Sequence, residues 1–305
     1  MWPAFLSRRT TLAASASISS WGMPIALRLT YRPSVGNEAT TIYRDAAGRS
    51  VPVPAAARVR RVVSLVPSLT EVVAALGAAD RLVGVTRYCP GLAPVVGGTK
   101  QVDLQMIIEL APDLVLANQE ENLERDVRKL AEAGLAVYVT YPRTLEQGLG
   151  VFAELGRLLG CEAAAARAEA RGRAVVDRVR AAVAGRPARR AACLVWREPL
   201  VAVGDDSYGG DVMKQLGLLN VCRDLGGERR YPFVDEATLR AAAPELVLLP
   251  DEPYAWTASE RDELGRALGA KVAAVDGSLL FWYGPRIARL HELADALAPA
   301  LRAEP

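Results

Sequence analysis

The stretch that decides the fold is TLEQGLGVFAELGRLLG, residues 144–160, followed by EAAAARAEARGRAVVDRVRAAVA, residues 162–184. Thr144 and Gln147 match a capping box ahead of an amphipathic helix that Gly160 ends. The second segment consists almost entirely of helix-forming residues, with a narrow apolar seam, and spans about 35 Å. We interpret it as a strut between two lobes; the alternative is an ordinary surface helix.

Signals for strands and helices alternate on both sides of this segment. This alternation predicts parallel sheets with helices on both faces, an α/β fold of two Rossmann-like lobes joined by one long backbone helix. A hairpin is expected at 40–54, strands at 61–66, 82–86, 114–117, 137–140, 192–196, 246–249 and 271–275, and helices at 67–76, 103–110, 121–133, 211–216, 237–242 and 287–301.

The pattern divides the chain into four parts: an N-terminal extension at 1–40, a first lobe at 41–143, a helical linker at 144–187 and a second lobe at 188–305. An internal echo supports two related lobes. The hexamer APDLVL at 111–116 matches APELVL at 243–248, and each is expected to end a helix and start a strand.

Composition and motifs exclude several classes of function. A formal charge of +2 and scattered arginines do not fit a nucleic-acid partner. The four cysteines form no C-x-x-C pair and His291 is the single histidine, so no metal site or covalent cofactor is expected. The sequence contains neither a phosphate-binding loop nor a G-x-S-x-G elbow, so no catalytic residue is assigned and an enzyme is the disfavoured alternative.

The start of the chain resembles an export signal. Ser7-Arg8-Arg9-Thr10-Thr11-Leu12 resembles a twin-arginine motif, and Ala14-Ser15-Ala16 has the form of a cleavage site. The apolar region between them is poor, so the alternative is a misassigned start or a degraded signal. The export-like start predicts the periplasm or another extracytoplasmic space. No run of 18 apolar residues is present, so no membrane span is expected, and no cysteine lies near the start, so no lipid anchor is expected.

The candidate binding residues follow the ends of the predicted strands. Ligands of open parallel sheets bind beyond the carboxyl ends of the strands, and flat aromatic faces with arginine suit a large planar ligand that carries acidic groups. Three of the candidates also have a structural alternative to ligand binding. Cys89 could be a packed core residue, Glu121 could be part of a helix cap and Trp282 could fill the core of the second lobe. The candidates are Pro67, Ser68, Arg87, Tyr88, Cys89 and Glu121 in the first lobe, and Trp196, Arg197, Tyr208, Tyr254 and Trp282 in the second.

Several segments together resemble the substrate-binding proteins of ABC importers that carry cobalamin, haem or ferric siderophores, and most of all the cobalamin-binding branch. The resemblance runs from about Thr41 to Leu301. It is carried by VSLVPSLTE at 63–71, GVTRYC at 84–89, GGTK at 97–100, APDLVLA at 111–117, EEN at 120–122 and LPDEPY at 249–254.

The resemblance implies a class III periplasmic binding protein whose lobes move little on binding. It implies a monomer that holds cobalamin or another metal chelate in its cleft and delivers it to a membrane permease. Pro67, Tyr88, Cys89, Trp196 and Tyr208 match the family's binding positions. A ferric siderophore or haem is the alternative ligand; a corrinoid carrier or sensor without a transport role is a further one.

The sequence departs from the family at the contacts with the permease. Family members dock through a glutamate on each lobe, and those two places hold Gln105 and Ala237 here. Glu109 and Glu236 lie nearby and are the expected substitutes.

Overall fold

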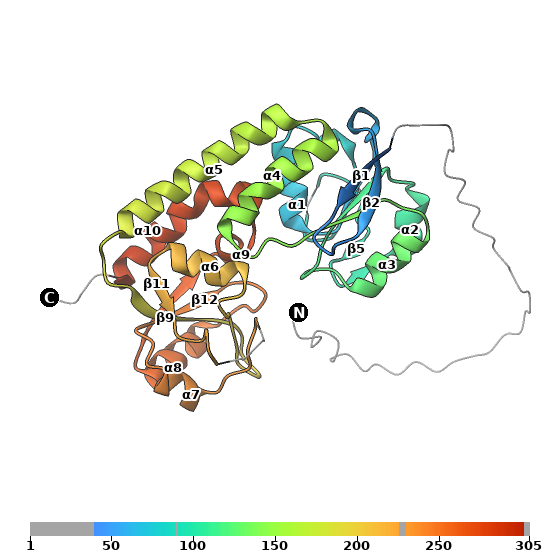
Figure 1. Cartoon of the computed structure of the whole chain (residues 1–305). Helices are drawn as coiled ribbons and strands as arrows, with labels where there is room; N and C mark the ends of the chain where they lie inside the picture. Colours follow the sequence, from blue (N-terminus) through green and yellow to red (C-terminus); the bar gives the residue numbers. More distant parts are fainter. Residues whose placement is uncertain (1–39, 90, 226–229, 302–305) are drawn as a thin grey trace, which may run out of the picture.

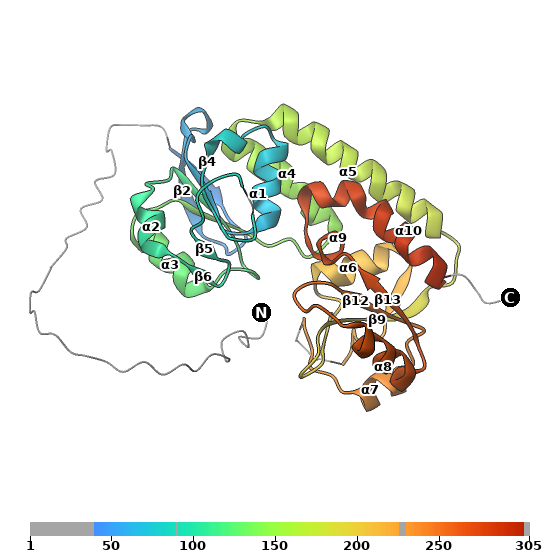
Figure 2. The same cartoon turned by 180° about the vertical axis from the view of Figure 1, so that it is seen from behind.

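A computed structural model describes residues 40–89, 91–225 and 230–301, and it has two α/β lobes bridged by a layer of helices (Figure 1). The predicted export segment lies outside the described residues. Figure 2 shows the same layer from behind, with α5 running from one lobe to the other. None of the described helices is both long and apolar enough to span a membrane.

The sheet of the first lobe is parallel, with strand order β4-β3-β7-β8. Its strands are buried along nearly their whole length, because helices cover both faces. Val63, Val115 and Val137 face α2 and α3, whereas Val62 and Leu114 face α1 and the helical layer. The elements are β3 (Val62–Ser64), α1 (Pro67–Ala75), β4 (Leu82–Val85), α2 (Leu104–Glu109), β7 (Leu114–Asn118), α3 (Glu124–Glu132) and β8 (Val137–Thr140).

Two small hairpins and two short 3-10 helices decorate this lobe. The first hairpin turns through Gly48, whose φ of 76° lies in the left-handed region, at the predicted position. The elements are β1 (Thr40–Arg44), β2 (Ser50–Pro54), η1 (Ala56–Arg58), η2 (Ala79–Arg81), β5 (Gly97–Gly98) and β6 (Gln101–Val102).

The second lobe repeats the arrangement around β9. Strands β11 and β12 pair with β9 in parallel, β13 pairs with β12 in parallel, and β10 adds an antiparallel edge. Helices α7 and α8 cover one face, and α6 and α9 lie on the side of the helical layer (Figure 1). The elements are β9 (Arg189–Trp196), β10 (Val201–Ala202), α6 (Tyr208–Gln215), β11 (Leu218–Asn220), α7 (Glu236–Ala241), β12 (Leu246–Pro250), α8 (Ala258–Leu268), β13 (Lys271–Val275) and α9 (Gly277–Phe281).

The helical layer consists of α4 (Leu145–Leu159), α5 (Glu162–Val183), η3 (Gly284–Arg289) and α10 (Leu290–Leu301). Helix α5 packs against the other three, and one continuous apolar core runs from the first lobe through this layer into the second. The predicted strut is therefore confirmed, although it is one helix of a layer and does not stand alone.

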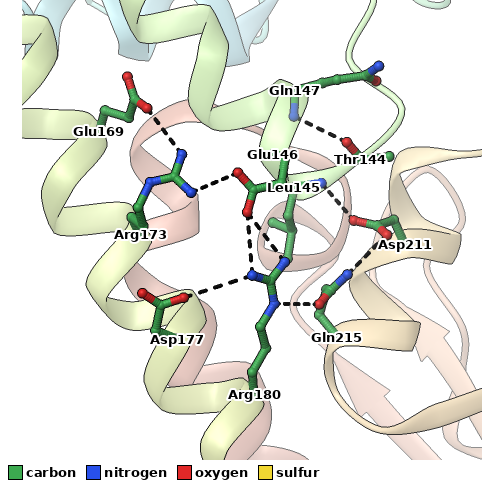
Figure 3. A network of polar contacts seen from close by, with 10 residues as sticks. All are labelled: Thr144, Leu145, Glu146, Gln147, Glu169, Arg173, Asp177, Arg180, Asp211 and Gln215. Carbon is green, nitrogen blue, oxygen red and sulfur yellow. Dashed lines mark hydrogen bonds and ion pairs between the residues drawn. The ribbon is translucent and has the colours of Figure 1, made fainter.

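A polar network fastens this layer to the second lobe (Figure 3). Glu146 of α4 accepts hydrogen bonds from Arg173 and Arg180 of α5, at 2.8 and 3.4 Å. Arg180 also donates to Gln215 of α6, and Asp211 of α6 accepts the Leu145 backbone N–H at 2.7 Å. The start of α4 is thus held by helices from both of its sides.

Some predicted element boundaries were wrong. The capping box is only half formed, because Thr144 accepts from the Gln147 N–H while the Gln147 side chain accepts from the Arg143 N–H. Helix α3 begins at Glu124, later than predicted, and α6 begins at Tyr208, earlier than predicted. The final predicted helix is divided into η3 and α10, and α8, α9, β10 and β11 were not predicted.

The internal echo corresponds to a matched pair of local structures. Ala111 and Ala243 both have positive φ, 42° and 45°, at the turn that leads into the strand. Beside each, an arginine binds the carbonyl groups that end the preceding helix: Arg61 binds Leu110, and Arg190 binds Ala243. Two lobes of related construction are the simplest reading of this match.

Candidate functional site

The strands of both lobes point their carboxyl ends toward the junction between the lobes. Asn118, at the end of β7, donates to the hydroxyl of Tyr283 from the second lobe at 3.1 Å. Arg143, after β8, donates to Asp206 of the second lobe at 2.8 Å. We call the residues that follow these strand ends the interlobe face, and the candidate site lies there.

An aromatic cluster occupies the second-lobe side of this face. The ring of Tyr254 lies edge-on to Trp196 and to Trp256, with centroids 5.4 and 4.9 Å apart. The Trp196 N–H donates to the Glu198 carbonyl and the Tyr254 hydroxyl to Glu260, which fixes both rings. Trp196 and Tyr254 remain partly exposed, so the cluster offers flat apolar surface in a fixed orientation.

Trp282 lies at the base of the interlobe face, between two charged groups. The guanidinium of Arg286 lies 5.1 Å from its ring centroid, and its indole hydrogen-bonds to Glu252. Arg286 also binds Glu71 of α1 through both carboxylate oxygens. Trp282 is packed on part of its surface only, so it does not act as a fully buried plug.

The predicted residues of the first lobe divide into exposed and buried sets. Tyr88 is 54% exposed, and Arg87 is exposed with its guanidinium against Gly98. Pro67 is the first residue of α1 and partly exposed, whereas Ser68 is buried. Cys89 is also buried, and its sulfur accepts a hydrogen bond from Thr70 at 3.1 Å, which fits the alternative of a packed core residue.

Two predicted residues of the second lobe have partners that keep them from the interlobe surface. Tyr208 is 4% exposed and packs edge-on against Tyr283 in the shared core. Arg197 pairs with Glu263 of α8 at 3.3 Å and with Glu236 of α7 at 3.9 Å. Tyr208 and Cys89 are therefore not available for ligand contact at the interlobe face. Arg197 could contact a ligand there only by giving up its ion pair with Glu263 or Glu236.

Carboxyl groups gather where the lobes meet, and only one of them was a candidate. Burial raises the pKa of Glu121 and raises the pKa of Glu252 to about 7. Burial lowers the pKa of Lys100, whose Nζ donates to the Glu120 carbonyl at 2.6 Å, and the charges of Glu121 and Glu120 oppose that shift. Burial also raises the pKa of Glu120. The pKa values of these side chains are therefore set by burial together with the charges of their neighbours.

The side chain of Asn118 holds Glu121 in position through hydrogen bonds to the backbone. Its side-chain oxygen accepts the backbone N–H groups of Glu120 and Glu121 at 2.8 and 3.1 Å. Helix α3 starts only at Glu124, so Asn118 caps the turn before the helix and does not cap the helix itself. This turn places both glutamates directly after β7.

The proposed docking glutamates are both exposed, one on each lobe. Glu109 ends α2 and accepts a hydrogen bond from Gln105 at 2.7 Å. Glu236 begins α7 after the cap residue Asp235. Asp103 caps α2 as Asp235 caps α7, so the two helices are equivalent parts of their lobes.

The chain belongs to the periplasmic binding protein family, whose pattern matches residues 62–264. Members of this family bind small ligands, and those that serve ABC transporters deliver their ligands to the membrane subunits of the transporter. Two-lobed parallel sheets, a long connecting helix and polar and aromatic side chains at the lobe junction agree with that class.

Similar proteins include both cobalamin binders and haem binders. The vitamin B12-binding protein of Vibrio cholerae is 24% identical over 220 residues, which cover 70% of this chain and 77% of that protein. An uncharacterised ABC transporter substrate-binding lipoprotein of Bacillus subtilis, YvrC, is 26% identical over 255 residues, covering 79% of this chain and 80% of the relative.

Solved structures agree in fold. The periplasmic vitamin B12-binding protein BtuF of Vibrio cholerae has a TM-score of 0.69 at 21% identity, covering 80% of this chain and 98% of that one. The periplasmic haem-binding protein RhuT of Roseiflexus sp. RS-1 has a TM-score of 0.66 at 21% identity, covering 80% and 99%. These TM-scores establish the shared fold, whereas sequence identity this low leaves the ligand open.

Proposed function

We propose that this protein captures cobalamin or a related metal chelate between its lobes, without a covalent bond, and delivers it to the permease of an ABC importer. The observation that carries the proposal is the partly exposed pair of rings Trp196 and Tyr254 on one lobe, together with the exposed Tyr88 on the other. Flat rings of this kind bind the face or edge of a large conjugated ligand. Similarity to vitamin B12-binding proteins supports a corrinoid.

Haem is the second candidate ligand, and a ferric siderophore the third. Similarity to haem-binding proteins of the same fold favours haem, since RhuT matches almost as well as BtuF. The test is to incubate the purified protein with cyanocobalamin, haemin or ferrichrome, remove free ligand by desalting and record the visible spectrum. Retained corrin absorbance supports the proposal; retained haemin or ferrichrome alone replaces cobalamin by that ligand.

A variant at Trp196 tests whether the rings form the site. Trp196→Ala should weaken binding of the retained ligand by about tenfold or more, because an aromatic contact and its buried area are lost. Ile42→Ala serves as control, since Ile42 is 61% exposed on the outer hairpin β1. Equal affinity of Trp196→Ala and the wild type removes this residue from the site. Failure to retain any chelate, with measurable turnover of another compound, would favour an enzyme.

We place the docking contacts at Glu109 and Glu236, on equivalent helices of the two lobes. The protein would act outside the cytoplasm, as a monomer, and each lobe would meet a basic side chain of the permease. Glu109→Lys and Glu236→Lys should each slow ligand uptake in cells that carry the cognate importer while ligand binding in solution is unchanged. Uptake at the wild-type rate in both variants would remove these two glutamates from the docking surface.

A further inference from the structure

Four arginines around the interlobe face are already paired with carboxylates of the protein, whereas the exposed Arg87 has no ion pair among the described residues. Arg286 pairs with Glu71 at 2.6 Å, and Arg143 and Arg230 share Asp206 at 2.8 and 3.2 Å. Arg197 pairs with Glu263, as described above. A carboxylate on a ligand would have to compete with these existing partners, so these arginines are poor binding groups for an anion.

The carboxyl groups of the same face lack such neutralisation. Among the described residues, no lysine or arginine nitrogen lies within 4.0 Å of the carboxylate of Glu121 or Glu252. The partner of Glu252 is the uncharged indole of Trp282. The charge of Lys100 acts on Glu121, and the charges of Arg230 and Lys100 both act on Glu120. The Lys100 ammonium itself is bonded to the Glu120 backbone carbonyl.

Unsatisfied polar atoms at this face indicate which groups a ligand would need. One carboxyl oxygen of Glu120 and the hydroxyl of Tyr141 are buried and have no hydrogen-bond partner among the described residues. The Glu120 oxygen is a buried acceptor without a donor, which costs free energy that a ligand N–H or O–H group would recover, whereas the Tyr141 hydroxyl can either donate or accept. Glu121 and Glu252 lie close enough for the charge of one to raise the pKa of the other, so a further negative charge there is unfavourable.

We infer that the interlobe face selects a chelate whose edge is uncharged or positively charged and carries N–H or O–H donors, over one whose edge carries carboxylates. Glu121 and Glu252 are the residues that set this preference. The inference rests on the proposed function, since it names the chemical class within the metal chelates. The preference arises from repulsion as well as attraction: an anionic edge meets partly buried carboxyl groups, whereas an amide edge can donate to the Glu120 oxygen that has no partner among the described residues.

The experiment compares ligands that differ only in edge charge. One pair is cyanocobalamin and its monocarboxylic acid derivatives, in which one edge amide is replaced by a carboxylate. The other pair is haemin and its dimethyl ester, in which both propionates are masked. Dissociation constants are measured for the wild type, Glu121→Gln, Glu252→Gln and the control Glu162→Gln, whose side chain is exposed at the start of α5. Thermal melting verifies that each variant is folded.

The uncharged member of whichever pair binds should bind the wild type about tenfold more tightly, and each glutamine variant should reduce that ratio to about threefold or less. The Glu162→Gln ratio should equal that of the wild type. If the wild type binds the carboxylate member at least as tightly, or if the ratio is unchanged in both variants, the inference is wrong while chelate capture stands. If neither pair binds and ferrichrome is not retained either, the proposed function fails and this inference fails with it.

Discussion

Arg286 of η3 donates to Glu71 of α1 through two nitrogens, Nε at 2.9 Å and Nη2 at 2.6 Å from the carboxylate oxygens. The two residues are 215 positions apart in sequence. Beside them, the hydroxyl of Tyr283 bonds to Asn118 and Thr140 at the ends of two strands of the first lobe. The segment before α10 therefore joins the lobes directly, in addition to the connection through α4 and α5.

This ion pair should contribute measurably to stability. A bidentate, partly buried arginine–carboxylate pair is stronger than an ordinary surface pair, so we expect a coupling free energy of about 1–2 kcal/mol between Glu71→Gln and Arg286→Gln. Urea unfolding of both single variants and of the double variant gives this value. Strictly additive effects would show that the contact adds nothing.

Two glycines of α4 should respond in opposite directions to alanine. A Cβ on Gly156 would lie 2.6 Å from the Cβ of Ala165 in α5, whereas a Cβ on Gly150 would meet nothing within 4 Å. Gly150→Ala should therefore stabilise the protein by about 0.5–1 kcal/mol through helix propensity. Gly156→Ala should destabilise it by about 1 kcal/mol or more, because the helices must separate. Thermal and urea unfolding measure both, and the same sign in both variants contradicts the packing described.

Replacing the positive-φ residues Ala111 and Ala243 by glycine should raise the free energy of unfolding. The left-handed conformation costs an alanine about 1–2 kcal/mol, and glycine adopts it freely at some cost in unfolded-chain entropy. Ala111→Gly and Ala243→Gly should each stabilise the protein by about 0.5–1 kcal/mol.

The matched control is Ala170→Gly, at an exposed position of α5, which should destabilise by about 1 kcal/mol. The urea midpoints of the three variants decide the matter. Destabilisation by Ala111→Gly or Ala243→Gly would mean that the alanine methyl group contributes packing that outweighs the strain.

Glu252 should give the protein a characteristic dependence on pH. Burial raises the folded-state pKa of Glu252 from 4.5 to about 7, so the folded state holds this proton more tightly than the unfolded state does. The resulting stabilisation is complete below pH 4.5 and is lost as the pH rises to 7. Glu252→Gln should therefore flatten the fall in unfolding free energy over this window and exceed the wild type in stability above it.

Glu292 provides a control of opposite sign. Hydrogen bonds from Arg289 lower the pKa of Glu292, so its contribution is present at neutral pH and is lost as the pH falls through the acidic range. Urea unfolding of Glu252→Gln and Glu292→Gln at pH 3, pH 5 and pH 8 separates the two effects, because the Glu292 contribution changes below pH 4.5 and the Glu252 contribution changes above it. A wild-type pH profile in Glu252→Gln would show that this carboxyl titrates normally.

The sequence was sufficient for the architecture because its main signals are local. The alternation of apolar strands with capped helices and the stops at Gly160 and Gly185 depend on neighbouring residues alone, and both glycines have the positive φ such stops require. Helix α8 was also within reach, since Thr257 and Glu260 form a complete capping box that the sequence pattern displays.

The site was harder to predict because burial and pairing depend on distant segments. The start of α6 was predicted three residues late, after the weak helix formers Gly209 and Gly210, and a Cβ on Gly210 would lie 2.4 Å from the Gly204 carbonyl oxygen. Tyr208, the first residue of this helix, lies in the core. Arg286 and Glu252 were missed because their partners, Glu71 and Trp282, are set by how the lobes meet. The binding roles of the exposed candidates remain predictions.

The way α10 lies on α5 has a consequence for biosynthesis. Roughly one hundred residues separate the two helices in sequence, so a ribosome needs about 5–20 s to produce the partner after α5 has emerged. During that delay the part of α5 that α10 covers in the folded protein lacks this partner. The apolar seam of α5 is narrow and lies among alanines and charged side chains. Helix α5 therefore exposes little apolar surface to solvent before α10 has been made.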